Sequence, residues 1–424
     1  MSMMKLKNYL KGNPLTARLY QKIRSAMQSP ANYTIGEIQP LVPRQCTLEG
    51  DKLRLNIITP SVDTKHVFGG ISTALKLFYE ICEKGGFDAR IIVVDAPVFP
   101  ESSVLSGEYE IVKPDTHKDV HRQVVPMHDR YGKTFPVAKN DIFIATGWWT
   151  AYTAFDVIRW QKEVYGISHP LVYMIQDYEP GFYPWSSRYL MADSTYRSEV
   201  PVYAVLNSKL LSDFFTEKGY TFEKSWSFDP KLNEALLKFL PEQGTQVAKK
   251  KQILVYGRPS TARNAFELLV YGLQEWVARQ PDAKEWAVLS AGEMHEDVPL
   301  GDGVVLHSVG KLTLQEYAQT MLDTYAGVSL MVSPHPSYPP LEMATFGVKT
   351  ITNGYDSKDL SGFSRNVVSL TSCAPRDIAA ALCKICNGYE GCGVISSNAD
   401  YLVADKTFGT IPQELAAALM QSIS

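Results

Sequence analysis

The chain has 424 residues, of which 45% are hydrophobic and 21% charged, and its formal net charge is −3. This length exceeds one ordinary hydrophobic core and predicts two domains of about 200 residues each. The near-neutral charge excludes the strongly basic composition typical of nucleic-acid-binding proteins. The sequence contains no apolar run of about 18 residues, so we expect no transmembrane helix. The first residues lack the apolar segment of a secretory signal, so we expect a cytoplasmic protein.

Residues 1–50 are expected to form a basic extension with a helical segment. Residues 1–36 contain six Lys or Arg residues and neither Asp nor Glu. Within them, residues 14–28 predict a helix with apolar side chains on one face. Such a helix fits contact with an anionic membrane, and it equally fits packing against the body of the protein. Both alternatives stay open at this level.

The first domain, predicted over residues 51–245, begins with a βαβ unit. A strand over 53–59 is followed by the pair Gly69-Gly70, by a helix, and by a second strand over 89–95. This order predicts a doubly wound α/β domain. The glycine turn lacks the G-x-G-x-x-G fingerprint, which disfavours a nicotinamide-dependent oxidoreductase.

Two further strands of this domain end in aromatic and acidic residues. Strand 141–146 leads into a Gly-Trp-Trp-Thr segment, and strand 171–175 opens into a loop with Asp177 and Glu179. Open α/β sheets bind ligands at the carboxyl ends of their strands, and aromatic rings beside carboxylates suit a sugar. The alternative is an aromatic loop that only packs on a helix. We predict sugar-acceptor contacts at Trp148, Trp149, Gln176, Tyr178, Phe182 and Tyr183.

The second domain is predicted over residues 246–410, after a polar linker over 241–251. Its first strand, 252–256, ends at Gly257-Arg258, and Arg263 precedes a helix. Two cations and a helix N-terminus at a strand end predict a phosphate site, unless both are merely solvated loop charges. An edge-type strand over 304–313 carries Lys311, a candidate third cation for a diphosphate.

The segment from Ser333 to Asn353 contains the most informative motif. Pro339 and Pro340 predict the start of a short helix, with Glu342 in its first turn and Gly347 at its end. A carboxylate beside backbone N–H groups at a helix start can bind sugar hydroxyls and phosphates. The alternative is a capping carboxylate without a ligand.

The cysteine pattern is weak evidence for a metal. Four of the six cysteines lie between residues 373 and 392, and Cys383 and Cys386 have a C-x-x-C spacing. The surrounding sequence predicts an amphipathic helix, and no second C-x-x-C pair follows. We therefore expect reduced thiols and no metal site.

The segment Tyr338-Pro-Pro-Leu-Glu-Met-Ala344 with Gly347 resembles the donor-binding motif of the retaining GT-B glycosyltransferases of family four. That family has a second Glu eight positions before Glu342, where this chain has Pro334, and the departure suggests a donor with fewer hydroxyls, such as a deoxy sugar. The Arg258 and Arg263 segment resembles the family's diphosphate-binding cations. The Gln-Asp-Tyr-Glu-Pro string at 176–180 resembles bacterial dTDP-rhamnose rhamnosyltransferases that build surface polysaccharides of the S-layer and O-antigen type.

This resemblance implies a GT-B fold, in which two Rossmann-like doubly wound domains face each other across a cleft. Residues 411–424 would form a helix that crosses back to the first domain. The first domain would hold the acceptor, and Asp177, Glu179 and Glu342 would be the catalytic residues. The donor-binding residues would be Gly69, Gly70, Gly257, Arg258, Arg263, Val309, Gly310, Lys311, Pro340, Leu341 and Thr345.

The implied reaction is the metal-independent transfer of L-rhamnose from dTDP-L-rhamnose to a rhamnan-type acceptor on a lipid carrier, with retention. No cofactor is expected, because the dTDP-sugar is a substrate, and the enzyme would work at the inner face of the cell membrane. Two alternatives share the fold: a nucleotide-sugar 2-epimerase or hydrolase, and a catalytically silent nucleotide-sugar-binding module.

Overall fold

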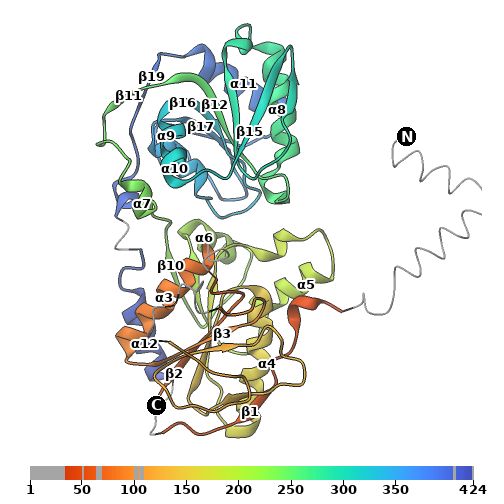
Figure 1. Ribbon diagram of the computed structural model, residues 1–424, viewed down its shortest axis with the longest axis vertical. Helices are drawn as coiled ribbons and strands as arrows, with labels where there is room; N and C mark the ends of the chain where they lie inside the picture. Colours follow the sequence, from red (N-terminus) through yellow and green to blue (C-terminus); the bar gives the residue numbers. More distant parts are fainter. Residues whose placement is uncertain are drawn as a thin grey trace, which may run out of the picture.

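The computed structural model describes residues 34–422, except 50–51, 64–68, 100–104, 106–108 and 404–406. The described chain forms two α/β lobes stacked along the long axis (Figure 1). The predicted helix over 14–28 lies outside the described residues. Among those that are described, no helix combines the length and apolar character needed to cross a membrane.

The first domain is built on an eight-stranded parallel sheet. Its central strands are buried along their whole length, which is typical of a parallel sheet with helices on both faces. The strand order across the sheet is β10 (Lys224–Phe228), β9 (Val202–Asn207), β8 (Leu171–Ile175), β7 (Asp141–Ala145), β2 (Arg54–Thr59), β3 (Asp88–Val93), β5 (Arg122–Pro126) and β4 (Glu110–Ile111).

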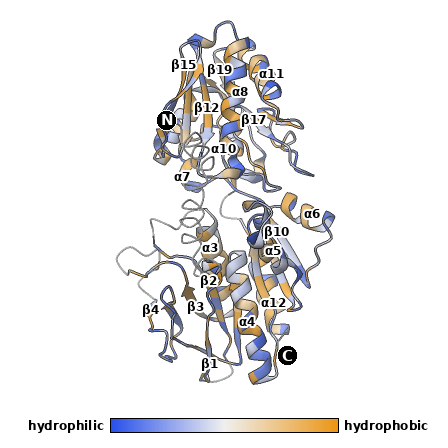
Figure 2. Ribbon diagram, turned by 90° about the vertical axis from the view of Figure 1, so that its right-hand side faces the viewer, coloured by the Kyte–Doolittle hydropathy of each residue, from blue (hydrophilic) through white to orange (hydrophobic). Residues whose placement is uncertain are grey.

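The second domain has a seven-stranded sheet that is parallel except for one edge strand. Figure 2 shows hydrophobic residues concentrated in the strands of both domains, whereas the helices carry a hydrophobic and a hydrophilic side. The order is β14 (Val298–Gly301), β15 (Val304–Gly310), β13 (Ala287–Gly292), β12 (Lys250–Gly257), β16 (Thr324–Val328), β17 (Lys349–Asn353) and β18 (Val367–Leu370).

Helices cover these sheets and join the two domains. Helix α12 packs against α3 of the first domain, and Leu415 and Leu419 share one buried cluster with Phe78 and Ile81 (Figure 1). The helices are α3 (Gly70–Gly85), α4 (Trp148–Tyr165), α5 (Ser187–Ser194), α6 (Lys209–Glu217), α7 (Glu234–Leu237), α8 (Phe266–Arg279), α9 (Leu314–Asp323), α10 (Pro339–Thr345), α11 (Pro375–Asn387) and α12 (Ile411–Gln421). Short segments complete the chain: β1 (Pro43–Gln45) with β6 (Phe135–Val137), β11 (Gln246–Ala248) with β19 (Cys392–Val394), and the 3-10 turns η2 (Gly36–Ile38), η4 (Glu179–Phe182), η5 (Thr195–Arg197), η6 (Ala262–Asn264), η7 (Ala283–Glu285) and η8 (Ala399–Leu402).

The doubly wound GT-B expectation is confirmed, but two local predictions are wrong. The end of the predicted linker is structured, because β11 pairs with β19 and the buried Lys249 ammonium donates to the carbonyls of Met321 and Phe346. The strand over 304–313 is not an edge, since β14 pairs with it on its outer side. The sequence did not indicate this short strand, because Pro299 and the glycines on either side of Asp302 are unfavourable in strands.

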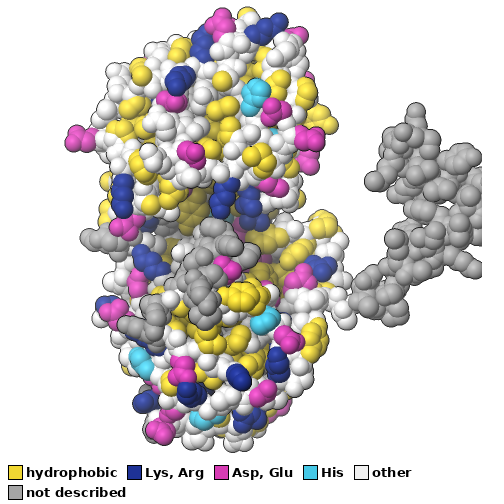
Figure 3. All heavy atoms as spheres, viewed as in Figure 1, with side chains coloured by type: hydrophobic (Ala, Val, Ile, Leu, Met, Phe, Trp, Pro, Cys, Tyr) yellow, Lys and Arg dark blue, Asp and Glu magenta, His cyan; other side chains and the backbone are white. Residues whose placement is uncertain are grey.

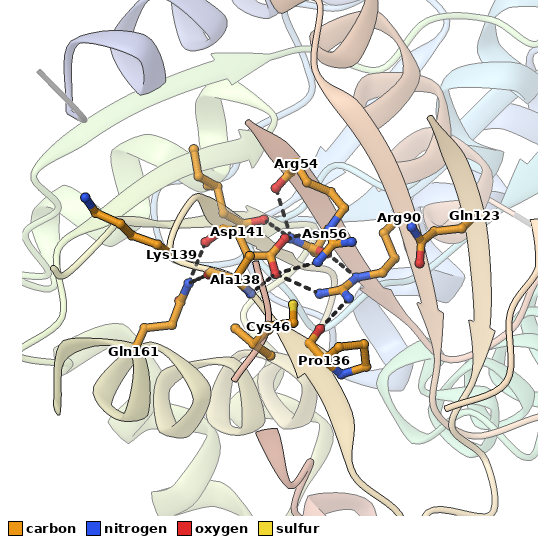
Figure 4. Close-up of polar contacts among 12 residues, drawn as sticks. Cys46, Arg54, Asn56, Arg90, Gln123, Pro136, Ala138, Lys139, Asp141 and Gln161 are labelled. Atoms are coloured by element: carbon orange, nitrogen blue, oxygen red, sulfur yellow. Dashed lines mark hydrogen bonds and ion pairs between the residues drawn. The ribbon is translucent and has the colours of Figure 1, made fainter. Parts of the chain in front are cut away.

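A buried ionic network joins three strands at the amino-terminal end of the first sheet (Figure 4). The Asp141 carboxylate on β7 accepts from Arg54 Nε on β2 at 2.7 Å and from Arg90 Nη2 on β3 at 3.2 Å. Asn56 Nδ2 donates to the same carboxylate at 3.1 Å. Burial opposes ionisation here, but Arg54 and Arg90 outweigh it and lower the pKa of Asp141 to about 2. The network lies opposite the carboxyl ends of the strands and therefore leaves that end for a ligand.

Candidate active site

A cavity of about 1020 Å³ lies between the two domains. In each sheet the strand order reverses beside the first strand of the domain, between β2 and β7 and between β12 and β16. Ligands of doubly wound sheets bind beside such reversals, at the carboxyl ends of the strands. Segments that follow β2, β7, β8, β9 and β12 line the cavity, and Figure 3 shows the hollow between the lobes with Lys and Arg side chains at its borders.

Ten of the predicted site residues meet in this cavity although they come from separate segments of both domains. They are Gly69, Gly70, Trp149, Gln176, Asp177, Glu179, Phe182, Arg258, Arg263 and Glu342. A second cavity of about 550 Å³, beside α3 and β5, contains none of the predicted residues in its described lining.

Gly70 is required by close packing inside the cavity. A Cβ atom at this position would lie 2.4 Å from the Gln176 side-chain oxygen. The glycine that begins α3 therefore allows the loop after β8 to approach the loop after β2. Gly69 beside it has a φ of +46°, a backbone conformation that L-residues rarely adopt.

Arg258 and Arg263 differ in their surroundings. Arg258 follows β12; its carbonyl accepts the Thr261 N–H at 3.0 Å, and its side chain makes no hydrogen bond or ion pair within the described chain. Arg263, in η6, lies 3.7 Å from the Asp177 carboxylate of the first domain, and its guanidinium stacks 4.3 Å from the Phe182 ring centroid. Arg258 is thus available for an anion, whereas Arg263 already joins the two domains.

Glu342 lies in α10 and is partly buried at the cavity. Burial raises the pKa of its carboxyl to about 7, against the opposing effect of the Tyr317 hydroxyl. The predicted anion site at the helix start is weaker than expected, because Pro339 and Pro340 at its first two positions have no N–H group. At the start of α10, the group that can bind a ligand is therefore the Glu342 carboxyl, whose pKa is about 7.

Asp177 and Glu179 both lie in the loop after β8, but they have different partners. Asp177 accepts a hydrogen bond from the Ser333 hydroxyl across the domain interface and another from the Tyr178 N–H. Glu179 accepts from the Trp148 N–H at 2.6 Å, and burial is the main cause that raises its pKa to about 8. Both carboxyl groups line the cavity, and Asp177 also contacts Ser333 and Arg263 of the second domain.

Three of the predicted acceptor residues, Trp148, Tyr178 and Tyr183, do not line the cavity, because their side chains pack within the first domain. Trp148 begins α4, its side chain is fully buried, and its indole N–H donates to the Tyr183 hydroxyl at 2.9 Å. Tyr178 packs against an aromatic cluster, and its hydroxyl bonds to that of Tyr220 at 3.0 Å. Trp149, Gln176 and Phe182 remain candidates.

Several predicted donor contacts also lie away from the cavity. Gly257 serves packing, since a Cβ there would meet the Ser290 hydroxyl at 1.9 Å. The side chains of Leu341 and Thr345 are buried inside the second domain. The other members of this set, none of which lines the cavity, are Val309, Gly310, Lys311 and Pro340.

Some cavity residues gave no signal in the sequence. Lys76 lies in α3, six residues after the Gly69-Gly70 pair, and Tyr317 lies in α9; neither residue belongs to a recognisable motif. Asn207 and His335 stand beside motifs that drew attention to other positions. Their place in the cavity depends on how the two domains meet.

This arrangement of two doubly wound domains around a cleft is the GT-B fold. Models of the WsaF N-terminal domain and the WsaF C-terminal domain match residues 54–209 and 251–383. Together they cover about two thirds of the chain, which belongs to the WsaF family.

The chain is also similar to individual known proteins. The O-antigen biosynthesis protein RfbC of Myxococcus xanthus is 28% identical over 219 residues, which are 50% of this chain and 15% of that protein. Sucrose-phosphate synthase from Thermosynechococcus elongatus has a TM-score of 0.51 at 11% identity, covering 87% of this chain and 95% of that one. The lipopolysaccharide outer core galactosyltransferase WaaB has a TM-score of 0.49 at 11% identity, covering 88% and 100%. The similarity to sucrose-phosphate synthase shows the fold of the chain.

Proposed function

We propose that the protein transfers L-rhamnose from dTDP-L-rhamnose to a surface-polysaccharide acceptor, with retention and without a metal. The observation that carries this proposal is the interdomain cavity, which brings Arg258 of the second domain opposite the Gly69-Gly70 turn of the first. A cation without a described partner, at a strand end, suits the diphosphate of a nucleotide sugar.

The charge distribution supports a donor in the second domain and an acceptor in the first. Departure of a nucleoside diphosphate places negative charge on phosphate oxygens, and the Arg258 guanidinium stabilises such charge in a cavity that partly excludes water. Arg263 can add a second positive charge if its 3.7 Å contact with Asp177 is exchanged for a phosphate. Glu342 binds a hydroxyl of the donor, and Asp177 and Glu179 orient the acceptor hydroxyl.

The identity of the sugar rests on the sequence resemblance. Pro334 provides no acceptor atom where related transferases have a carboxylate, and a deoxy sugar needs fewer such contacts. The relationship to an O-antigen biosynthesis protein fits an acceptor that belongs to a surface polysaccharide on a lipid carrier. We place the reaction at the inner face of the cell membrane.

A donor panel tests this function. Purified protein is incubated with a rhamnan oligosaccharide and, separately, with dTDP-L-rhamnose, dTDP-glucose, UDP-glucose and GDP-mannose, with and without EDTA. We expect transfer from dTDP-L-rhamnose only, unchanged by EDTA, and nuclear magnetic resonance of the product reports the anomeric configuration. Release of free sugar or an epimer without transfer would support a hydrolase or epimerase instead, and binding without turnover would support a silent module.

A further inference from the structure

The loop from Ser333 to Ser337 is held in one conformation at the wall of the cavity. Ser333 donates its hydroxyl to the Asp177 carboxylate of the first domain and accepts the His335 backbone N–H at 3.0 Å. The Ser337 backbone N–H in turn donates to Nδ1 of the His335 ring at 3.0 Å. The two bonds within the loop fix the imidazole of His335, and the bond from Ser333 to Asp177 attaches the loop to the first domain.

The bond from Ser337 determines which nitrogen of His335 carries the proton. Nδ1 accepts an N–H, so the neutral ring has its proton on Nε2. Burial lowers the pKa of His335 to about 4, which keeps the ring neutral under ordinary conditions. His335 is 5% exposed and lines the cavity, and its Nε2 has no hydrogen-bond partner among the described residues. Such a buried donor is expected to have a ligand, because buried polar groups rarely stay unpaired.

Asn207 presents a matching acceptor from the other domain. It is the last residue of β9, is 3% exposed, and lines the same cavity. Its side-chain oxygen also lacks a partner in the described part of the chain. The following residue, Ser208, has a φ of 129°, a costly backbone conformation that sets the direction in which the chain leaves the strand.

Tyr338 connects the two side chains. Its ring centroid lies 5.9 Å from that of His335. Its hydroxyl lies beside the Asn207 amide, which offsets part of the rise that burial causes in the pKa of Tyr338. Asn207 and His335 thus both neighbour Tyr338 in the lining of the cavity.

We propose that Nε2–H of His335 and the side-chain oxygen of Asn207 bind one hydroxyl group of the transferred sugar. A hydroxyl both donates and accepts, so it satisfies the unpaired donor and the unpaired acceptor together. A phosphate oxygen can only accept and would leave the Asn207 oxygen unpaired. This subsite rests on the proposed function, and it adds the recognition of the sugar to that of the nucleotide.

The pair also makes sugar binding dependent on domain arrangement. Asn207 comes from the first domain and His335 from the second, so a sugar that bridges them contacts both domains at once. A site built around a hydroxyl discriminates against a sugar that lacks it, because the buried donor and acceptor then stay unpaired.

Isothermal titration calorimetry with dTDP and dTDP-L-rhamnose tests the subsite. The measured quantity is the ratio of the two dissociation constants, which isolates the contribution of the sugar. We expect His335→Ala and Asn207→Ala each to lower the preference for the sugar nucleotide roughly threefold to tenfold, the effect of losing one neutral hydrogen bond. The affinity for dTDP itself should stay within about twofold of the wild-type value.

Two further variants sharpen the result. His335→Gln keeps an N–H donor and should retain most of the preference, while His307→Ala, at an exposed histidine on β15, is the matched control. An unchanged ratio in both alanine variants overturns the subsite while leaving the proposed function intact. If His335→Ala binds neither dTDP nor dTDP-L-rhamnose because the loop structure is lost, the ratio of dissociation constants for Asn207→Ala tests the subsite instead. A wild-type protein that binds neither ligand overturns the proposed function, and the subsite with it.

Discussion

Replacement of Glu179 by Gln should change the pH dependence of stability in a defined direction. The carboxyl group is 7% exposed and accepts from the Trp148 N–H at 2.6 Å and from the Tyr173 hydroxyl at 3.3 Å. Burial outweighs these bonds, and together with the charge of Asp177 it raises the pKa of Glu179 from 4.5 to about 8. The folded protein therefore retains a proton that the unfolded chain has already released at neutral pH.

The sign follows from proton binding. Because the folded state binds more protons than the unfolded state, the stabilising effect is complete below pH 4.5 and is lost as the pH rises toward about 8. One proton corresponds to about 1.4 kcal/mol per pH unit, so the wild type should lose roughly 2 to 3 kcal/mol through Glu179 between about pH 6 and pH 8. Gln has nearly the same shape and no charge, and it should remove this part of the dependence.

Urea denaturation of the ligand-free protein at a series of pH values, followed by tryptophan fluorescence, measures the effect. We expect Glu179→Gln to become more stable relative to the wild type by roughly 2 to 3 kcal/mol between about pH 6 and pH 8, and the two proteins to differ little only near pH 4.5. Glu217→Gln, at an exposed position on α6, should follow the wild type throughout. Parallel curves for wild type and Glu179→Gln would show that the buried carboxyl is already ionised, and the reasoning from burial would be refuted.

Two other substitutions give separate tests. Glu342→Gln should preserve the fold without lowering the thermal unfolding midpoint, since burial already raises the pKa of this carboxyl to about 7, while turnover falls roughly tenfold or more because the carboxylate that binds the donor is lost; wild-type rates in a transfer assay would reduce Glu342 to a structural residue. Asp141→Ala should lower the free energy of unfolding by about 3 to 5 kcal/mol, because it leaves the guanidinium groups of Arg54 and Arg90 buried without their counter-ion. Asp129→Ala, at an exposed ion pair, is the control for chemical denaturation and should change stability by less than about 1 kcal/mol; equal effects at both positions would contradict the role given to the network.

Most of the fold could be predicted from local patterns. A buried strand such as β8 is a continuous apolar run, and segments such as α3 have helical periodicity. The strands β11 and β14 could not be predicted, because they are only three and four residues long and β14 contains Pro299, so that pairing with a neighbouring strand stabilises them. The start of α4 at Trp148 was not apparent from the sequence, since Gly147 before it has no side chain that signals a cap.

Site residues could be predicted where they lie at the end of a strand or the start of a helix. They could not be predicted where tertiary contacts determine the position of the side chain. Arg258 and Glu342 stand at strand and helix boundaries that the sequence shows. Tyr178 has the same kind of position, but its ring turns into an aromatic cluster formed by distant residues. The contact between Asp177 and Arg263 joins two domains, and no local pattern encodes it.

Direct binding of dTDP to the wild-type protein and to Arg258→Ala tests the account most closely. Calorimetry should show binding to the wild type and a dissociation constant roughly tenfold to a hundredfold higher for the variant, as expected for the loss of charge-assisted hydrogen bonds to phosphate. Arg279→Ala, at an exposed arginine at the end of α8, should bind like the wild type. Equal dissociation constants for the wild type and Arg258→Ala would contradict a nucleotide-sugar site in the cleft that is built on this cation.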